Sequence, residues 1–268
     1  MALIAALPMY RFPWTEAAED RLWAALAERL RDDGVDAPER LTREGEVEAQ
    51  WRNARLVFGQ TCGYPLMRSL RDAVVVLAAP AYAFDGCEGP RHSSFLIARA
   101  EDSRCGLGDF KGARAAINGR DSNTGMNLFR AAVAPLANGR PFFSATLVTG
   151  AHLKSMEAVA DDRADIAAID CVTFAHAWRG RPELASRLKV LGRTASTLAL
   201  PFIASARLPE MTLSAIREAL RSALVDPALR PALATLGLVG AVELDAGAYE
   251  PVLALERQAA ALGYPELA

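Results

Sequence analysis

Four times along this chain, a short apolar strand runs into a polar turn that opens a helix. Strands that alternate with helices in this way predict α/β layers built on parallel sheet. In such sheets, ligands bind beyond the carboxyl ends of the strands. The repeated junctions therefore predict one functional face, to which the turns contribute. The turns are residues 61–65, 118–125, 150–152 and 170–174.

The central junction is the richest in polar groups. A strand at residues 113–117 leads into Ser122-Asn123-Thr124-Gly125, all of which are good helix-start residues. A helix is predicted from Gly125 to about residue 134, ended by Pro135. Its first turn offers backbone N–H groups, hydroxyls and the positive end of the helix dipole, which together can seat an oxyanion. The alternative is an ordinary capped helix.

The remaining elements follow from apolar runs, helical spacing and breakers. The run at 74–79 reads as a buried strand that Pro80 ends. Further strands are predicted at residues 3–7, 55–60, 94–100, 145–149, 165–169, 188–191 and 201–206. A helix is predicted to start at residue 15 or 16 and to end at Gly34, and two more are predicted to start after residue 152 and at residue 170. Three further helices are predicted at residues 213–224, 228–236 and 248–261.

Composition excludes several classes of protein. The 268 residues allow one or two domains, and the net charge of -2 with no basic run argues against nucleic acid as a partner. No apolar run approaches the ~20 residues of a membrane span. The apolar N-terminus lacks the features of a secretory signal, so the protein is expected to be periplasmic if a signal has been removed and cytoplasmic otherwise.

The four cysteines are widely spaced, and no CxxC pair or histidine spacing suggests a metal site. Neither a metal nor a cofactor is expected. A Cys87–Cys105 disulfide is conceivable, because both residues lie in polar segments that read as loops.

The ordered set of motifs resembles the solute-binding proteins of phosphate, phosphite and phosphonate ABC transporters. The likeness covers nearly the whole chain. It is carried by residues 7–10 (LPMY), 60–65 (QTCGYP), 118–125 (NGRDSNTG), 148–152 (VTGAH) and 165–170 (DIAAID).

This resemblance implies a type II periplasmic-binding-protein fold, with mixed sheets flanked by helices and a ligand cleft between two lobes. Residues 1–93 and 200–268 would form lobe 1, and residues 94–199 would form an inserted lobe 2. Crossover strands near 94–100 and 191–202 would join them. The function implied is that of a monomeric binding protein, not an enzyme, which clamps a small oxyanion and serves an ABC permease.

Each junction then supplies candidate ligand contacts. Lobe 2 would donate hydrogen bonds from its helix start, and lobe 1 from the turn after its second strand. A histidine would donate to the anion, an aspartate would accept a P–OH proton or bind a ligand amine, and two tyrosines would close over the organic substituent. These candidates are Ser122, Asn123, Thr124 and Gly125; Thr61, Cys62 and Gly63; and His152, Asp170, Tyr10 and Tyr82.

Other interpretations stay open at this point. The tyrosines could be core aromatics, and His152 and Asp170 could simply cap helices. An enzyme on the same fold could use Cys62 as a nucleophile paired with His152, because a helix start lowers a thiol pKa. A cytoplasmic ligand sensor is the third possibility. His92 and His176 are expected to be surface or packing residues.

Overall fold

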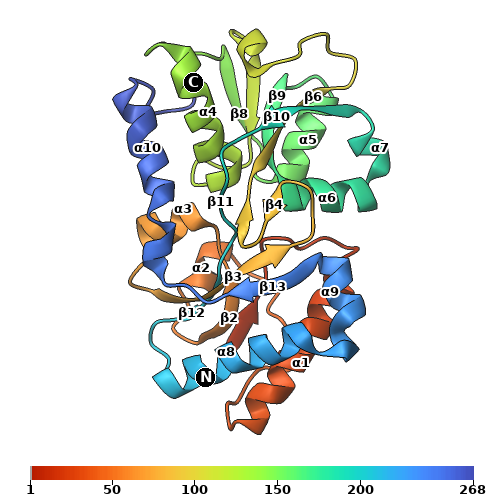
Figure 1. Cartoon of the computed structure of the whole chain (residues 1–268), viewed down its shortest axis with the longest axis vertical. Helices are drawn as coiled ribbons and strands as arrows, with labels where there is room; N and C mark the ends of the chain where they lie inside the picture. Colours follow the sequence, from red (N-terminus) through yellow and green to blue (C-terminus); the bar gives the residue numbers. More distant parts are fainter. Residues whose placement is uncertain (1) are drawn as a thin grey trace. The chain divides into compact units, whose positions relative to one another are not determined.

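The computed structural model describes residues 2–268, and these divide into two compact units (Figure 1). Of the described residues, unit 1 comprises 2–83, Glu88–Pro90 and Leu198–Ala248. Unit 2 comprises Phe84–Cys87, Arg91–Thr197 and Tyr249–Ala268. Short elements lie where the chain changes unit: β4 (Cys87–Glu88), β5 (Arg91–His92), β11 (Thr197–Leu198) and the 3₁₀ turn η5 (Ala246–Tyr249).

Unit 1 is built on a five-stranded sheet in the order β1-β2-β12-β3-β13. Strand β1 is parallel to β2, whereas β12 and β13 run antiparallel to their neighbours. The strands are β1 (Ile4–Ala6), β2 (Leu56–Gln60), β3 (Val74–Tyr82), β12 (Phe202–Ser205) and β13 (Leu238–Val242). Its helical elements are α1 (Glu16–Asp32), α2 (Val47–Trp51), α3 (Gly63–Pro65), η1 (Leu66–Leu70), α8 (Glu210–Val225), η4 (Pro227–Leu229) and α9 (Arg230–Leu236).

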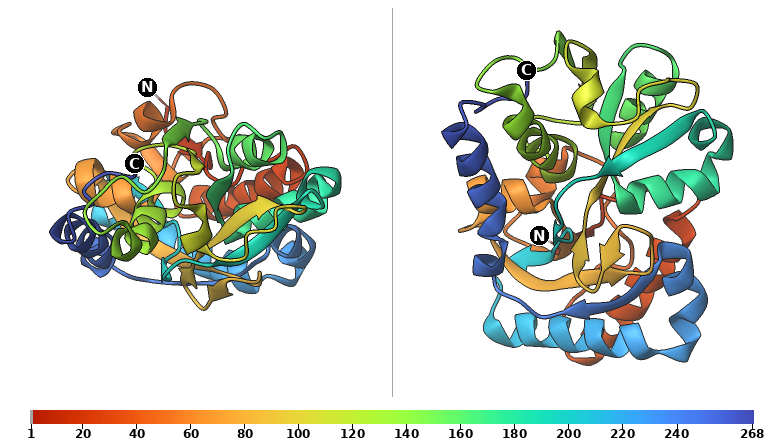
Figure 2. Two further views of the ribbon diagram at one scale, coloured as in Figure 1. Left: turned by 90° about the horizontal axis from the view of Figure 1, so that it is seen from above. Right: turned by 45° about the horizontal axis from the view of Figure 1, so that its top comes forward.

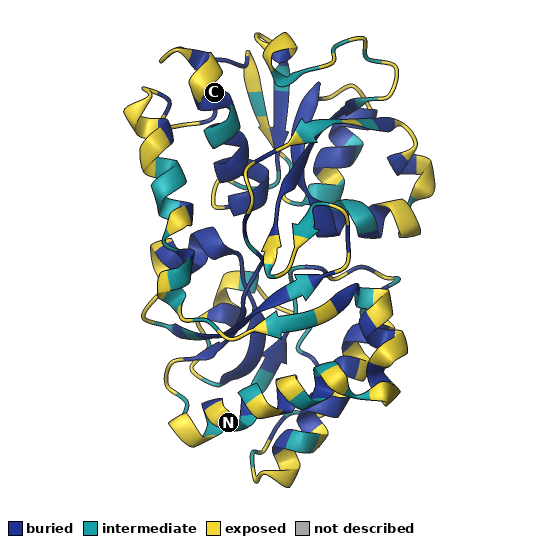
Figure 3. Cartoon of the chain, viewed as in Figure 1, coloured by how far each residue is buried: buried dark blue, intermediate teal, exposed yellow. Residues whose placement is uncertain are grey.

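The core of unit 1 contains a row of packed aromatic rings. Trp23 of α1 stacks on Phe58 of β2 at 6.1 Å, and Phe58 packs against Phe202 of β12 at 5.0 Å. Helix α8 buries Leu213, Ile216 and the other core residues of one face and leaves its opposite face to solvent, as Figure 3 shows. This is the helical periodicity from which the helix was predicted.

Unit 2 has a second five-stranded sheet in the order β10-β6-β9-β7-β8. The three strands β9, β7 and β8 are parallel, and β6 and β10 are antiparallel to their neighbours. The strands are β6 (Ser94–Arg99), β7 (Arg114–Ile117), β8 (Ala145–Val148), β9 (Ile166–Asp170) and β10 (Leu188–Arg193). The helical elements are η2 (Leu107–Phe110), η3 (Asn123–Asn127), α4 (Leu128–Ala137), α5 (His152–Ala160), α6 (Cys171–Gly180), α7 (Pro182–Ala185) and α10 (Pro251–Ala261).

The C-terminal segment, residues 249–268, belongs to unit 2, although the prediction assigned all of residues 200–268 to lobe 1. Helix α10 packs beside α4 (Figure 2). The amide of Asn127 donates to the Val252 carbonyl at 3.0 Å, and Arg130 donates to the Pro265 carbonyl at 2.7 Å. The Phe142 N–H donates to Ala268 at 2.7 Å. These long-range bonds were invisible in the sequence pattern, which shows only that a final helix exists.

Two prolines do not end their elements, contrary to the prediction. Strand β3 continues past Pro80. Its pairing with β12 ends at Ala78, so Pro80 is not required to donate a backbone hydrogen bond to β12. Helix α4 continues past Pro135 to a left-handed cap at Asn138. Burial of its apolar face offsets the loss of one helical hydrogen bond.

The topology also differs from the prediction in two respects. Strand β13 was missed, whereas the mixed sheets that the family resemblance implied are present in both units. Strand β6 lies wholly inside unit 2, so the chain changes unit at residues 83–91 rather than along 94–100. No helix among residues 2–268 combines the length and apolar character that a membrane crossing requires.

Candidate functional site

The helix start after β7 is built as a tight, buried turn. Ser122 is the N-cap residue, and its Oγ accepts a hydrogen bond from the Gly125 N–H at 3.0 Å. The Ser122 carbonyl accepts from the Asn127 N–H at 3.0 Å, which makes the first turn π-helical before α4 begins. The continuous helical run therefore starts at Asn123, two residues earlier than predicted.

The Asn123 side chain makes two hydrogen bonds to other side chains of unit 2. Its Nδ2 donates to Thr197 Oγ1 at 3.0 Å, and its Oδ1 accepts from Asn127 Nδ2 at 3.1 Å. The amide thus fixes the first turn of the helix. A side-chain contact from Asn123 to a ligand stays a prediction.

Gly125 occupies a position that admits no side chain. A Cβ atom built there would lie 1.8 Å from Asn118 Oδ1 and 3.0 Å from His152 Cε1. Asn118 Oδ1 is itself buried and has no hydrogen-bond partner among residues 2–268. The backbone of the helix start can therefore approach both neighbouring turns, those after β7 and β8, only because residue 125 is glycine.

Thr124 and His152 join two of the predicted junctions. Thr124 Oγ1 lies 3.0 Å from His152 Nε2 at the first residue of α5, and Ser94 Oγ donates to the Thr124 carbonyl at 2.8 Å. Desolvation lowers the pKa of His152 to about 4, against the partial compensation of the nearby Asp170 charge. The imidazole is therefore neutral at pH 7, and its bond to Thr124 is one between neutral groups.

Asp170 caps α6 and pairs with a histidine. Its Oδ1 accepts from the Val172 and Thr173 N–H groups at 2.9 and 3.1 Å, and its Oδ2 lies 3.2 Å from His92 Nδ1. Burial by itself raises the pKa of this carboxyl, but the charge and hydrogen bond of His92, helped by His152, lower it below its usual value. His92, which was expected at the surface or in packing, is fully buried against Asp170, in agreement with the packing alternative.

In unit 1, three of the candidates lie in the turn after β2. Thr61 is fully buried, and its N–H donates to the Pro201 carbonyl at 3.2 Å. Thr61 Oγ1 makes no hydrogen bond to any of residues 2–268. Cys62 is the N-cap of α3, whose first residue is Gly63, and the Cys62 carbonyl accepts from the Leu66 N–H at 3.1 Å.

The two candidate tyrosines lie together in unit 1. The rings of Tyr10 and Tyr82 meet edge to face at 5.6 Å. Gln60, which sequence reasoning missed, donates from Nε2 to the Tyr82 hydroxyl at 3.1 Å and to the Leu200 carbonyl at 3.0 Å. Its place at the end of β2, directly before Thr61, was the signal that could have identified it.

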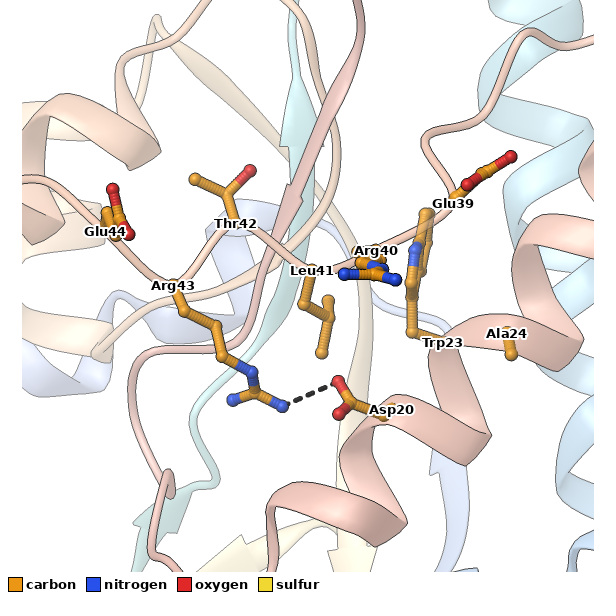
Figure 4. Close-up of a pocket in the computed structure, with 9 residues that line it drawn as sticks. All are labelled: Asp20, Trp23, Ala24, Glu39, Arg40, Leu41, Thr42, Arg43 and Glu44. Atoms are coloured by element: carbon orange, nitrogen blue, oxygen red, sulfur yellow. Dashed lines mark hydrogen bonds and ion pairs between the residues drawn. The ribbon is translucent and has the colours of Figure 1, made fainter.

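A separate cavity of about 700 Å³ lies in unit 1 between α1 and the segment before α2 (Figure 4). None of the predicted site residues lines it. One of its two arginines is already paired with carboxylates, because Arg43 contacts Asp20 at 2.7 Å and Glu19 at 3.0 Å. The lining residues are Asp20, Trp23, Ala24, Glu39, Arg40, Leu41, Thr42, Arg43 and Glu44.

Comparison with solved structures supports the expected fold. A binding protein component of an ABC phosphonate transporter from Pseudomonas aeruginosa is similar, with a TM-score of 0.78, 16% identity, and coverage of 97% of this chain and 87% of that one. PhnD1 from Prochlorococcus marinus, solved with methylphosphonate, gives a TM-score of 0.77, 12% identity, and coverage of 96% and 97%. A Xanthomonas citri protein solved with a chloride ion gives a TM-score of 0.74 and 16% identity, with coverage of 98% of this chain and 99% of that one.

No curated protein matches the chain. A family model described as "ABC transporter, phosphonate, periplasmic substrate-binding protein" matches residues 5–249, which is most of the chain. The match covers the strand–turn–helix junctions of both units, and the structural similarity extends over both. The chain therefore belongs to the family of periplasmic substrate-binding proteins of phosphonate ABC transporters.

Proposed function

We propose that this protein binds a small phosphorus oxyanion, a phosphonate or phosphate-type ligand, and presents it to an ABC permease. The observation that carries the proposal is the helix start at Ser122–Gly125, with the Thr124 hydroxyl held by His152 at 3.0 Å. Family membership favours the same ligand class. The family description also supports a periplasmic location, and a monomer is proposed as the working state.

The chemistry of the helix start suits an oxyanion. The first N–H groups of a helix have no intrahelical acceptors, and the dipole favours negative charge there. If His152 carries its proton on Nε2, that N–H donates to Thr124 Oγ1 and the threonine hydroxyl is left to donate to the anion. Each such bond to a charged acceptor contributes about 1.5–3 kcal/mol. Four to six of them suffice for micromolar binding after the costs of association.

Unit 1 is proposed to supply further donors from Thr61, Cys62 and Gly63. The support is the buried, unpaired Thr61 hydroxyl, since leaving such a group unsatisfied costs about 1–3 kcal/mol. A ligand oxygen would give it a partner. Tyr10 and Tyr82 are proposed to contact the organic substituent, and the bond from Gln60 orients the Tyr82 hydroxyl.

For Asp170, the observed bonds favour positioning over direct ligand contact, because both carboxylate oxygens already have partners in unit 2. The enzyme interpretation pairs Cys62 with His152, but His152 Nε2 already bonds to Thr124 Oγ1 at 3.0 Å. Transport binding is therefore the function that the site supports best.

The test is a thermal-shift panel of phosphate, phosphite, methylphosphonate, aminoethylphosphonate, sulfate and several carboxylates on the full chain. A ligand at a hundred times its Kd should stabilise the protein by about 2.7 kcal/mol. A clear shift with a phosphorus oxyanion that Thr124→Ala abolishes supports the proposal. Thr235→Ala, an exposed threonine on α9, is the matched control and should keep the shift.

Absence of a shift with every phosphorus compound would reject the proposed ligand class. A shift that survives both Thr124→Ala and Ser122→Ala would instead leave the ligand class standing and remove the helix start as its seat. Isothermal titration of the responding compound then gives the affinity of each variant.

A further inference from the structure

Two thiols meet inside unit 2. Cys87 Sγ and Cys171 Sγ are 3.4 Å apart, although the two residues are 84 positions apart in the chain. Cys171 is buried, whereas Cys87 keeps part of its surface exposed. Cys105, the partner considered from sequence, is exposed, and its thiol donates to the Ser103 carbonyl at 3.3 Å, whereas the thiol that lies against Cys87 is that of Cys171.

The backbone segments that carry the two thiols lie in close contact. Gly86 has φ +87, and a Cβ atom there would lie 2.7 Å from Cys171 Cβ. The Gly86 carbonyl accepts from the Ser93 N–H at 3.0 Å, and the Cys171 N–H donates to the Ser93 carbonyl at 3.1 Å. The close approach of the two segments therefore depends on a glycine and on a shared partner, Ser93.

A ring contact anchors the same segment. Phe84 packs edge to face on His176 of α6 at 5.1 Å, and the Arg179 guanidinium lies 4.8 Å from the Phe84 ring centre. Phe84, three residues before Cys87, is thus packed against the second half of α6, the helix that Cys171 begins. The thiols are held together by this packing, without a covalent bond.

We propose that Cys87 and Cys171 form a reversible disulfide, a modification site that ties the segment Phe84–Cys87 to the N-terminus of α6. A disulfide has an S–S distance of about 2.05 Å, so the two sulfur atoms need to approach by about 1.4 Å from their 3.4 Å separation. Rotation of the half-exposed Cys87 side chain is the movement with least resistance. An oxidising compartment, such as the one in the family description, is where such bonds persist.

The reaction is thiol–disulfide exchange with a small disulfide or the disulfide of an oxidoreductase. The Cys87 thiolate attacks one sulfur of the oxidant, forms a mixed disulfide and releases the first oxidant thiol. Cys171 then loses its proton to solvent and attacks Cys87 Sγ, and the second oxidant thiol leaves. Two protein thiols are oxidised to one disulfide, and one oxidant disulfide is reduced to two thiols.

The order of attack follows from the surroundings. The hydrogen bond with Cys87, burial and the charge of Asp170 all raise the pKa of Cys171. Cys171 is therefore a poor first nucleophile, and Cys87 is the one that an oxidant reaches. Once Cys87 is in a mixed disulfide, its thiol no longer raises the pKa of Cys171.

The experiment incubates the reduced full chain with oxidised glutathione, blocks free thiols by alkylation and maps disulfides in a non-reducing digest. The expected result is loss of the Cys87 and Cys171 thiols, with the peptides of these two residues joined by a disulfide. Dithiothreitol should restore both thiols. Cys105→Ser, the matched control, should keep the crosslink, and Cys87→Ser should abolish it.

Retention of all four thiols, a glutathione adduct that persists on Cys87, or a crosslink to another cysteine would each overturn the proposal. Mapping of the unmodified sequence needs no variant at buried Cys171, so a folding defect there cannot obscure the result. The outcome is also independent of the oxyanion proposal, because no ligand takes part in it.

Discussion

Thr124 Oγ1 lies 3.0 Å from His152 Nε2, and this contact joins the start of the central helix to the start of α5. It links the parts of the chain that follow β7 and β8, which are paired in parallel. The side chain that we propose donates to the anion is thus oriented by the histidine at the next junction. Both stability and binding should respond to changes at this pair.

The first prediction concerns pH. The pKa of His152 is about 4 in the folded protein and about 6.5 without its surroundings, so the unfolded chain takes up a proton first as pH falls. His152 should therefore make stability fall from pH 6.5 toward pH 4, by at most about 1.4 kcal/mol per pH unit. The measurement is urea unfolding at several pH values across this window.

The control for this prediction is His152→Gln, which cannot titrate. Glu19 acts in the opposite direction, because burial raises the pKa of its carboxyl, so the quantity to compare is the difference between the two proteins at each pH. Parallel curves for the two proteins would show that His152 is not the titrating group.

The second prediction is that Gly125→Ala abolishes the oxyanion-induced thermal shift and lowers Tm. The new Cβ would lie 1.8 Å from Asn118 Oδ1, so either the asparagine or the helix start has to move. A displaced first turn no longer presents its N–H groups in the same place. Thermal melts with and without the responding anion measure both effects.

Gly192→Ala is the matched comparison, because Gly192 lies in β10 of the same unit and an added Cβ meets no atom within 4 Å. Its Tm and its ligand response should stay close to those of the unmodified protein. Equal behaviour of the two alanine variants would refute the steric argument at residue 125.

Much of the fold was predictable because it depends on local patterns. The apolar runs at β2, β7 and β9 and the helical spacing in α1 placed these elements within a residue or two. Strand β13 was missed although Leu238–Val242 is an apolar run, and its pairing with β3 could not be foreseen because β3 is distant in sequence. Antiparallel pairing of this kind is a long-range property that strand–helix alternation does not encode.

In the candidate site, too, features that depend on local sequence were predicted and contacts that depend on long-range packing were not. Ser122 and Gly125 were identified correctly as a helix start because capping chemistry is local. The bond from His92 to Asp170 was not predicted, since the two residues meet only when β6 and β9 pair. The proximity of Cys87 to Cys171 arises equally from packing between segments that share no motif.

The third prediction concerns the opposite end of the unit 2 sheet from the helix start. Asp165 Oδ2 accepts from the Arg114 N–H and Nε at 2.8 and 3.0 Å, and Asp165 Oδ1 accepts from Arg99 Nη2 at 3.2 Å. Asp165→Asn should destabilise the protein by about 2 kcal/mol, because hydrogen bonds between charged groups are lost. Ligand affinity should not change, and denaturant unfolding with parallel titration tests both statements.

The comparison for Asp165 is the exposed pair of Glu243 and Arg221, whose atoms lie 2.7 Å apart. Glu243→Gln should leave the unfolding midpoint unchanged, because exposed pairs are screened by solvent. A loss of stability at residue 243 as large as that at residue 165 would contradict the distinction drawn between the two sites.

The last prediction separates a ligand-binding hydroxyl from a structural one. Thr61 and Thr15 are both fully buried, but Thr15 Oγ1 accepts from the Phe12 N–H at 3.0 Å, whereas Thr61 Oγ1 has no partner among residues 2–268. Thr61→Val should therefore raise the stability of the ligand-free protein by about 1 kcal/mol, because an unsatisfied group is removed. The same change should weaken anion binding about tenfold, the loss of one hydrogen bond to a charged acceptor. Thr15→Val should instead lower stability and leave affinity intact. Chemical unfolding and calorimetric titration of both variants test the pair of opposite effects. If Thr61→Val destabilises the protein without changing affinity, the Thr61 hydroxyl is structural and is not a ligand contact.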